Sequence, residues 1–208
     1  MLAEIFLSAG LAAIMTVAGA IWIDKLYGTC ADLSFPEKIP ERSKFRRPIL
    51  FCGLSVSNWL VFTTINMPEK FFILAAIFLL VLMTVTDFEQ YMLFDAMTAP
   101  LALLGATFVW QTGLNVQDHL LAAIIGGGIF FGFAMLSKGS LGGGDIKLVA
   151  ALGLWLGCEK LLNAVLIATI FGGLAALMMI LLKQKDRGSY FAYGPYFALS
   201  AIYILLTD

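Results

Sequence analysis

Two aspartates stand at the ends of apolar stretches, where ionisable side chains are rare and usually functional. Asp87 ends one stretch in VTDFEQYMLFD, and Asp145 opens another in LGGGDIKL. Two carboxylates at one poorly hydrated site can share a proton. The ionised carboxylate can then take a proton from water while the protonated one polarises a peptide carbonyl. The chemistry that this pair predicts is peptide hydrolysis without a covalent intermediate.

Three glycines, Gly142, Gly143 and Gly144, come directly before the second aspartate. Glycine permits unusual dihedrals and close approach of another backbone, so this loop is suited to receive an extended substrate segment. An aspartate after a glycine turn can also serve only to cap a helix. For Asp145 alone, capping is the stronger interpretation. A second aspartate, Asp87, on the same side of the membrane makes the catalytic interpretation the stronger one.

The other reactive side chains do not form a rival site. His119, the only histidine, falls at the opposite membrane boundary from the aspartates, so we interpret it as a boundary residue rather than a ligand. The three cysteines, Cys30, Cys52 and Cys158, form no CxxC pair, which argues against a disulfide framework or a zinc site. The net charge of -1 argues against a nucleic-acid partner.

Composition indicates that membrane-spanning helices position these residues. Hydrophobic residues make up 61% of the 208-residue chain and charged residues 13%, about half the charged share of a soluble domain. We expect an all-α, polytopic helix bundle with about eight transmembrane helices (six to eight), each near 20 residues. Residues 1–69 would form an N-terminal two-helix region, and 70–208 a six-helix core. The apolar stretches are 2–23, 48–65, 71–86, 95–112, 118–137, 146–158, 160–182 and 190–206.

The basic residues predict how the bundle is oriented. Placing the polar loop 24–47 in the cytoplasm puts the loops 87–94, 138–145 and 183–189 there as well. Together with Lys147, just past the loop 138–145, that side then holds 11 of the 13 lysines and arginines, as the positive-inside rule requires. The N-terminus would face out. Both aspartates, although 58 positions apart, would lie at the cytoplasmic boundary.

The same residues resemble the motifs of the type IV prepilin peptidases, membrane aspartyl proteases of the GxGD kind. The block DFEQYMLFD, Asp87 to Asp95, is similar to the family pattern DxxxxxxPD, with Phe94 where proline is usual. The block SKGSLGGGDIKLVAALGLWLG, 137–157, is similar to a second family motif and contains the GxGD core. The segment YGPYFALSA, 193–201, resembles a third. The resemblance covers roughly residues 70–208.

The resemblance implies that Asp87 and Asp145 are the catalytic pair. It also implies a prepilin or pseudopilin substrate with a short basic leader, and the bacterial inner membrane as the location. Glu89 would contact the leader or be a solvated interfacial charge. Lys147 would anchor at the interface or touch the substrate rather than pair with Asp145. We predict that Asp95 lies at the start of a helix and caps it.

Two departures from the family pattern limit what carries over. Longer members hold two CxxC pairs in the N-terminal cytoplasmic region, whereas this loop holds only Cys30. We therefore expect no zinc, and nothing here supports S-adenosylmethionine as a methyl donor. Gly139, Ser140 and Phe94 replace the commoner residues, which predicts a different substrate preference. An ion-coupled transporter and a non-catalytic assembly protein remain alternatives. The sequence does not predict the oligomeric state.

Overall fold

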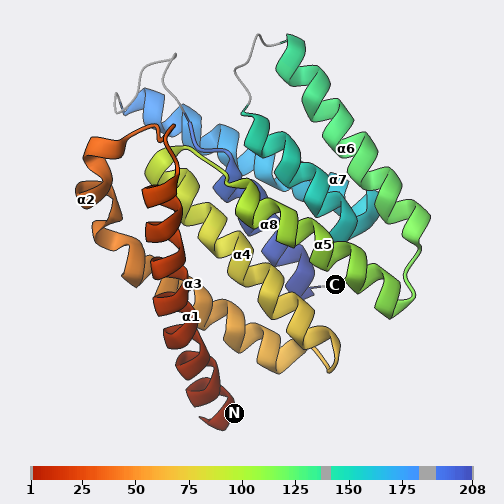
Figure 1. Cartoon of the computed structure of the whole chain (residues 1–208). Coiled ribbons are helices and arrows are strands. Elements are labelled where there is room, and N and C mark those ends of the chain that lie inside the picture. The colour runs from red at the N-terminus through yellow and green to blue at the C-terminus, as the bar shows by residue number, and fades with distance from the viewer. Residues whose placement is uncertain (1, 137–141, 183–190, 208) are drawn as a thin grey trace.

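The computed structural model describes residues 2–136, 142–182 and 191–207, and in these ranges the chain is helical without strands. The all-α prediction is thus confirmed. Short helical turns join the first two long helices (Figure 1). The elements are α1 (Leu2–Thr29), η1 (Pro36–Lys38), α2 (Ile39–Arg42), η2 (Ser43–Phe45), α3 (Arg46–Thr64), α4 (Glu69–Gln90), α5 (Asp95–Thr112), α6 (Val116–Leu136), α7 (Gly143–Leu181) and α8 (Gly194–Thr207).

The outer surface of the bundle is apolar, as contact with lipid requires. Side chains such as Leu136, Trp110 and Phe6 point outward and are more than half exposed. The helices α4, α6 and α7, together with Glu4–Thr29 of α1, are each long and apolar enough to cross a bilayer, whereas α8 is shorter. The chain is therefore a multi-pass membrane protein, and the predicted number of eight spans is approximate.

Helix α7 accounts for two of the predicted spans. The sixth and seventh apolar stretches form one continuous element that breaks at Gly157, where φ is 72° and ψ is 179°. The chain turns back at this point (Figure 1). A side chain at Gly157 would overlap the Asp118 carboxylate, and that carboxylate accepts a hydrogen bond from the Cys158 N–H at 3.1 Å. Glycine is thus required at the turn both for its positive φ and for space.

The end of α4 and the starts of α5, α7 and α8 lie at the same end of the bundle, which we call the aspartate end (Figure 1). Helix α4 is the centre of the fold, because it packs against α3, α5 and α8 and buries most of its length. The connection from α1 to α3 lies at this end too. The basic residues predicted for two of its loops, Lys138, Lys183, Lys185 and Arg187, lie outside the described residues. The division of the chain at residue 69 stays a prediction.

Candidate active site

A cavity of about 200 Å³ opens at the aspartate end between the last turn of α4, the connection to α5 and the first turn of α7. Both aspartates that the sequence singled out line it, so the fold brings Asp87 and Asp145 together. The three predicted glycines line it as well. The remaining lining residues belong to the α4–α5 connection and are Tyr91, Met92 and Leu93.

Asp87 is fixed in this cavity from two directions. Its side chain is 6% exposed, and its Oδ2 accepts a hydrogen bond from the Gly194 backbone N–H at 3.0 Å. Its own carbonyl accepts the Tyr91 N–H at 2.9 Å, and Tyr91 ends α4 in the left-handed conformation. That conformation turns the chain abruptly out of the helix. The α4–α5 connection can therefore pass beside the carboxylate.

Gly194 is a site residue to which the sequence analysis assigned no role. A Cβ at this position would lie 2.8 Å from Asp87 Oδ2 and 3.2 Å from Leu93 Cδ2, both closer than ordinary van der Waals contact. Only glycine therefore lets the start of α8 come near enough to donate its backbone N–H to the carboxylate. The signal in the sequence was the glycine of the segment YGPYFALSA.

Asp145 lies in the first turn of α7, where the helix dipole favours a carboxylate. The N-cap is Gly142, which makes no side-chain cap, so Asp145 does not have the capping role considered as the alternative. Its own N–H donates to the Gly142 carbonyl at 3.1 Å. Its Oδ1 is buried and finds no hydrogen-bond partner among the described residues. Buried carboxylate oxygens are normally satisfied, so this atom is a candidate for contact with water or substrate.

The three glycines before Asp145 differ in what surrounds them. A Cβ at Gly144 would lie 2.8 Å from the Leu93 Cβ, so glycine is needed where the α4–α5 connection crosses the start of α7. A Cβ at Gly142 would lie 3.2 Å from Asp145 Oδ2, whereas one at Gly143 would meet nothing within 4 Å. Gly144 thus has a packing role, and Gly143 borders open space.

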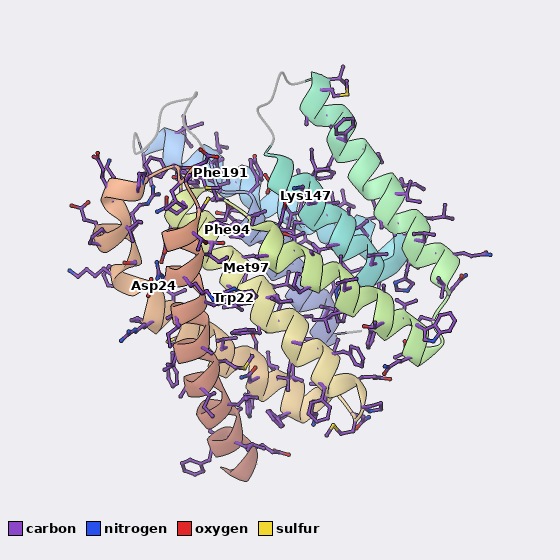
Figure 2. The ribbon with its side chains drawn as sticks, viewed as in Figure 1. Trp22, Asp24, Phe94, Met97, Lys147 and Phe191 are labelled. Carbon is purple, nitrogen blue, oxygen red and sulfur yellow. The ribbon has the colours of Figure 1, made fainter. Side chains whose placement is uncertain are left out.

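Lys147 does not line the aspartate cavity. Its Nζ donates to both carboxylate oxygens of Asp95 at 2.7 Å, and both side chains are exposed. Figure 2 labels Lys147 at the start of α7. Lys147 thus pairs with Asp95, a partner that the sequence analysis did not foresee. Its role at the interface or against the substrate stays a prediction. Helix α5 begins at Asp95, as predicted, yet its N-cap is Phe94 and no side chain caps it. The carboxylate of Asp95 binds Lys147 instead of capping the helix.

The structure corrects one interpretation of Glu89, that of a solvated interfacial charge, whereas contact with the leader stays a prediction. Glu89 is 4% exposed, so it is not a solvated interfacial charge, and it does not line the aspartate cavity. The Arg46 guanidinium donates to both of its oxygens, and the Tyr27 hydroxyl donates to Oε2 at 3.0 Å. Burying a carboxylate is unfavourable unless an opposite charge pairs with it. Arg46 supplies that charge, so the Glu89 carboxylate faces α1 and α3 instead of solvent.

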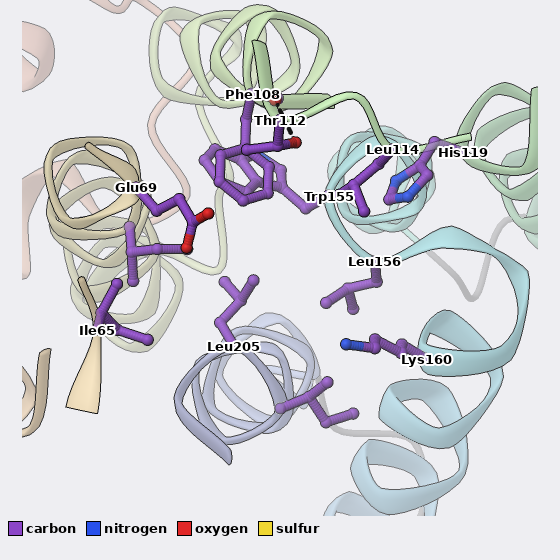
Figure 3. A pocket seen from close by; sticks show the side chains of 12 residues that line it. Ile65, Glu69, Phe108, Thr112, Leu114, His119, Trp155, Leu156, Lys160 and Leu205 are labelled. Atoms are coloured by element: carbon purple, nitrogen blue, oxygen red, sulfur yellow. Dashed lines mark hydrogen bonds between the residues drawn. The ribbon is translucent and has the colours of Figure 1, made fainter. Parts of the chain in front are cut away.

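A second cavity, of about 330 Å³, lies at the opposite end of the bundle and has Phe108 and Trp155 among its walls (Figure 3). His119 lines this cavity, and its Nδ1 donates to the Leu154 carbonyl at 3.0 Å. It is thus remote from the aspartates, as predicted. Within the described ranges, no three His, Cys, Asp or Glu side chains gather as metal ligands. The expectations about zinc and S-adenosylmethionine stay predictions.

Comparison with known proteins identifies the family. The model of the type IV leader peptidase family matches residues 73–177, half of the chain. Proteins named prepilin leader peptidase/N-methyltransferase are similar to it. That of Pectobacterium carotovorum is 35% identical over 137 residues, 63% of this chain and 49% of the relative. That of Escherichia coli K12 is 35% identical over 126 residues, which cover 58% of this chain and 56% of the relative.

The chain spans about half the length of the curated relatives it matches. No solved structure gives a significant match. The family match includes the ends of α4 and α7 at which the two aspartates lie. On the strength of that match over half its length, the chain belongs to the type IV leader peptidase family.

Proposed function

We propose that this protein is a membrane-embedded aspartyl endopeptidase that removes the leader from prepilin or pseudopilin precursors, with Asp87 and Asp145 as its catalytic acids. One observation carries the proposal: two carboxylates distant in sequence line one cavity. The relatives, which are named prepilin leader peptidases, support the reaction class and the kind of substrate.

The cavity supports a mechanism with two carboxylates and one water molecule. The ionised carboxylate takes a proton from water, and the protonated one donates to the carbonyl oxygen of the scissile bond. The water oxygen attacks the carbonyl carbon and forms a tetrahedral intermediate. The C–N bond then breaks as a carboxyl group returns a proton to the leaving amine. The Gly194 N–H orients Asp87 for this exchange, and orientation of this kind lowers the barrier substantially. Gly142, Gly143 and Gly144 form a wall without side chains, along which an extended substrate can lie.

The proposed location of the reaction is the cytoplasmic boundary of the bacterial inner membrane, with the N-terminus outside. The basic loop between α1 and α3 lies at the aspartate end of the bundle, which supports this orientation. The basic leader of the precursor would then reach the cavity from the cytoplasm. Methylation of the product is not part of the proposal, and neither zinc nor S-adenosylmethionine is assigned a role.

The test is cleavage of a purified prepilin by the reconstituted wild-type protein and by Asp87→Asn and Asp145→Asn. Asparagine keeps the shape of the side chain but cannot exchange the proton, so we expect each variant to lose about 100-fold to 10,000-fold in rate. Asp95→Asn, at the same end of the bundle, is the matched control and should keep its activity.

Circular dichroism should show that all variants stay helical. Cleavage by Asp145→Asn at the wild-type rate would refute the assignment. A wild-type protein that cleaves no prepilin, with both aspartates freely replaceable in cells, would favour a non-catalytic assembly role. Ion flux that depends on either aspartate would favour a transporter.

A further inference from the structure

A buried charge network joins the N-terminal helices to the last turn of α4. Arg46, the first residue of α3, is 4% exposed. Its Nε lies 2.9 Å from Glu89 Oε1 and its Nη2 lies 2.6 Å from Glu89 Oε2. Its Nη1 binds Asp24 of α1, the one residue of this network that Figure 2 labels. The Tyr27 hydroxyl, also from α1, completes the shell around Glu89.

Further contacts fasten the same turn to the connection between α1 and α3. The Gln90 side chain binds the backbone of Phe35 twice, accepting its N–H at 2.9 Å and donating to its carbonyl at 3.3 Å. Arg42 donates to the Phe88 carbonyl at 3.2 Å. Its guanidinium lies 5.0 Å from the ring centroid of Tyr91, within the range of a cation–π contact. The last three residues of α4 and its cap, Tyr91, are thus held by this connection together with Tyr27 and Arg46.

The geometry of the helix links these contacts to the candidate active site. Residues two apart on an α-helix point about 200° apart, so Asp87 and Glu89 face opposite sides of α4. Asp87 meets the Gly194 amide of α8, while Glu89 meets Arg46. The last turn of α4 is therefore held on both sides, and it leads directly into Tyr91 and the connection that lines the cavity.

A network of this kind is a costly way to gain stability alone. Burying an ion pair removes two charges from water, and well-packed apolar residues of the same volume often serve stability equally well or better. Directional hydrogen bonds to both oxygens of Glu89 instead specify one rotation of the helix end. Fixed rotation matters here because the carboxylate two residues earlier belongs to the cavity.

We propose that the connection between α1 and α3, acting through the Arg46–Glu89 pair, is a positioning element that sets the orientation of Asp87. Arg46 and Glu89 are positioning residues: neither lines the aspartate cavity, and they act through the last turn of α4. The inference rests on the proposed role of Asp87 as a catalytic acid. It predicts that turnover, rather than substrate binding, depends on the pair.

The experiment compares four proteins reconstituted in lipid: wild type, Arg46→Met with Glu89→Gln together, Arg46→Lys, and Asp95→Asn. The double variant removes both buried charges, and the Asp24 carboxylate that loses its Arg46 partner is exposed to solvent. No buried charge is therefore left unpaired, and the chain should still fold. We expect its kcat to fall by about 10-fold to 100-fold, as for a small displacement of a catalytic group, with KM almost unchanged. Arg46→Lys keeps the charge without the planar fork and should fall in between. Asp95→Asn breaks an exposed ion pair at the same end and should match wild type.

Amide hydrogen exchange gives a readout that does not need catalysis. The double variant should lose protection at residues 87–94, while the middle of α4 keeps it. Unchanged kcat with unchanged exchange would overturn the proposal. A raised KM with unchanged kcat would overturn it too, because that result would mark Glu89 as a substrate contact. If the wild type cleaves no prepilin, the proposed function fails, and exchange alone then decides whether the pair positions the helix end.

Discussion

The two acids of the cavity are held in different ways. Asp87 lies late in a helix, is buried, and has one oxygen bound by a backbone N–H from 107 positions away. Asp145 lies in the first turn of a helix, and its own N–H donates a hydrogen bond to the carbonyl of Gly142, only three positions earlier. One of its oxygens has no partner in the described part of the chain. Long-range packing fixes one acid, and local backbone geometry places the other.

This contrast teaches where the cavity can adapt and where it cannot. An acid held by several elements moves only if those elements move together. An acid that follows a run of glycines can adjust with its loop, since glycine restricts the backbone least. We therefore expect substitutions around Asp87 to cost more activity than equally small ones around Asp145. Three single-methyl additions at glycines can test this asymmetry.

Gly194→Ala should have the largest effect. The new Cβ would lie 2.8 Å from Asp87 Oδ2, so the carboxylate must rotate away and lose its N–H partner. A displacement of about 1 Å at a catalytic group can cost about 100-fold in rate, and we expect a loss of that order in kcat for prepilin cleavage. Only the ends of the Asp87 and Leu93 side chains must yield, so the melting temperature should change little. Near-normal cleavage by this variant would show that the Gly194 contact does not hold Asp87 in its working position.

Gly144→Ala should have an intermediate effect, because Gly144 directly precedes Asp145 and packs against the α4–α5 connection that follows Asp87. Its Cβ would lie 2.8 Å from the Cβ of Leu93, so the α4–α5 connection must shift as a whole. Overpacking of this kind costs about 1–3 kcal/mol. We expect a lower melting temperature together with about a tenfold loss of kcat, equivalent to about 1.4 kcal/mol. A loss of activity without any loss of stability would place the substrate, rather than Leu93, against Gly144.

The asymmetry also explains which features the sequence could predict. The GxGD block is contiguous, so Asp145 and its glycines could be recognised together. The pairing of Asp145 with Asp87 followed from counting spans, because alternation fixes the end of the bundle on which each acid lies. The all-α fold followed from composition, since a chain with so little charge cannot cover a water-facing surface.

Contacts between distant elements could not be predicted in the same way. Nothing local marks Arg46 as the partner of Glu89, because six basic residues share the loop 24–47. The Gly194 contact depends on how closely α8 approaches α4, which hydropathy does not report. The break of α7 at Gly157 could not be predicted for another reason. The hydropathy of two apolar stretches separated by one residue is the same whether the helix bends, breaks or ends between them.

Gly142→Ala should have the smallest effect of the three and gives the sharpest view of the Asp145 side. Its Cβ would lie 3.2 Å from Asp145 Oδ2, a contact that a shift of a few tenths of an ångström in the carboxylate relieves. We expect about a threefold loss of kcat, equivalent to about 0.65 kcal/mol, with the melting temperature unchanged. Gly143→Ala is the matched comparison, because its Cβ meets nothing within 4 Å and alters only backbone freedom. Its loss should be smaller still. If Gly143→Ala instead proves the more damaging change, mainly through KM, the open space beside Gly143 is where the substrate backbone lies, and the glycine wall restricts access more than it positions Asp145.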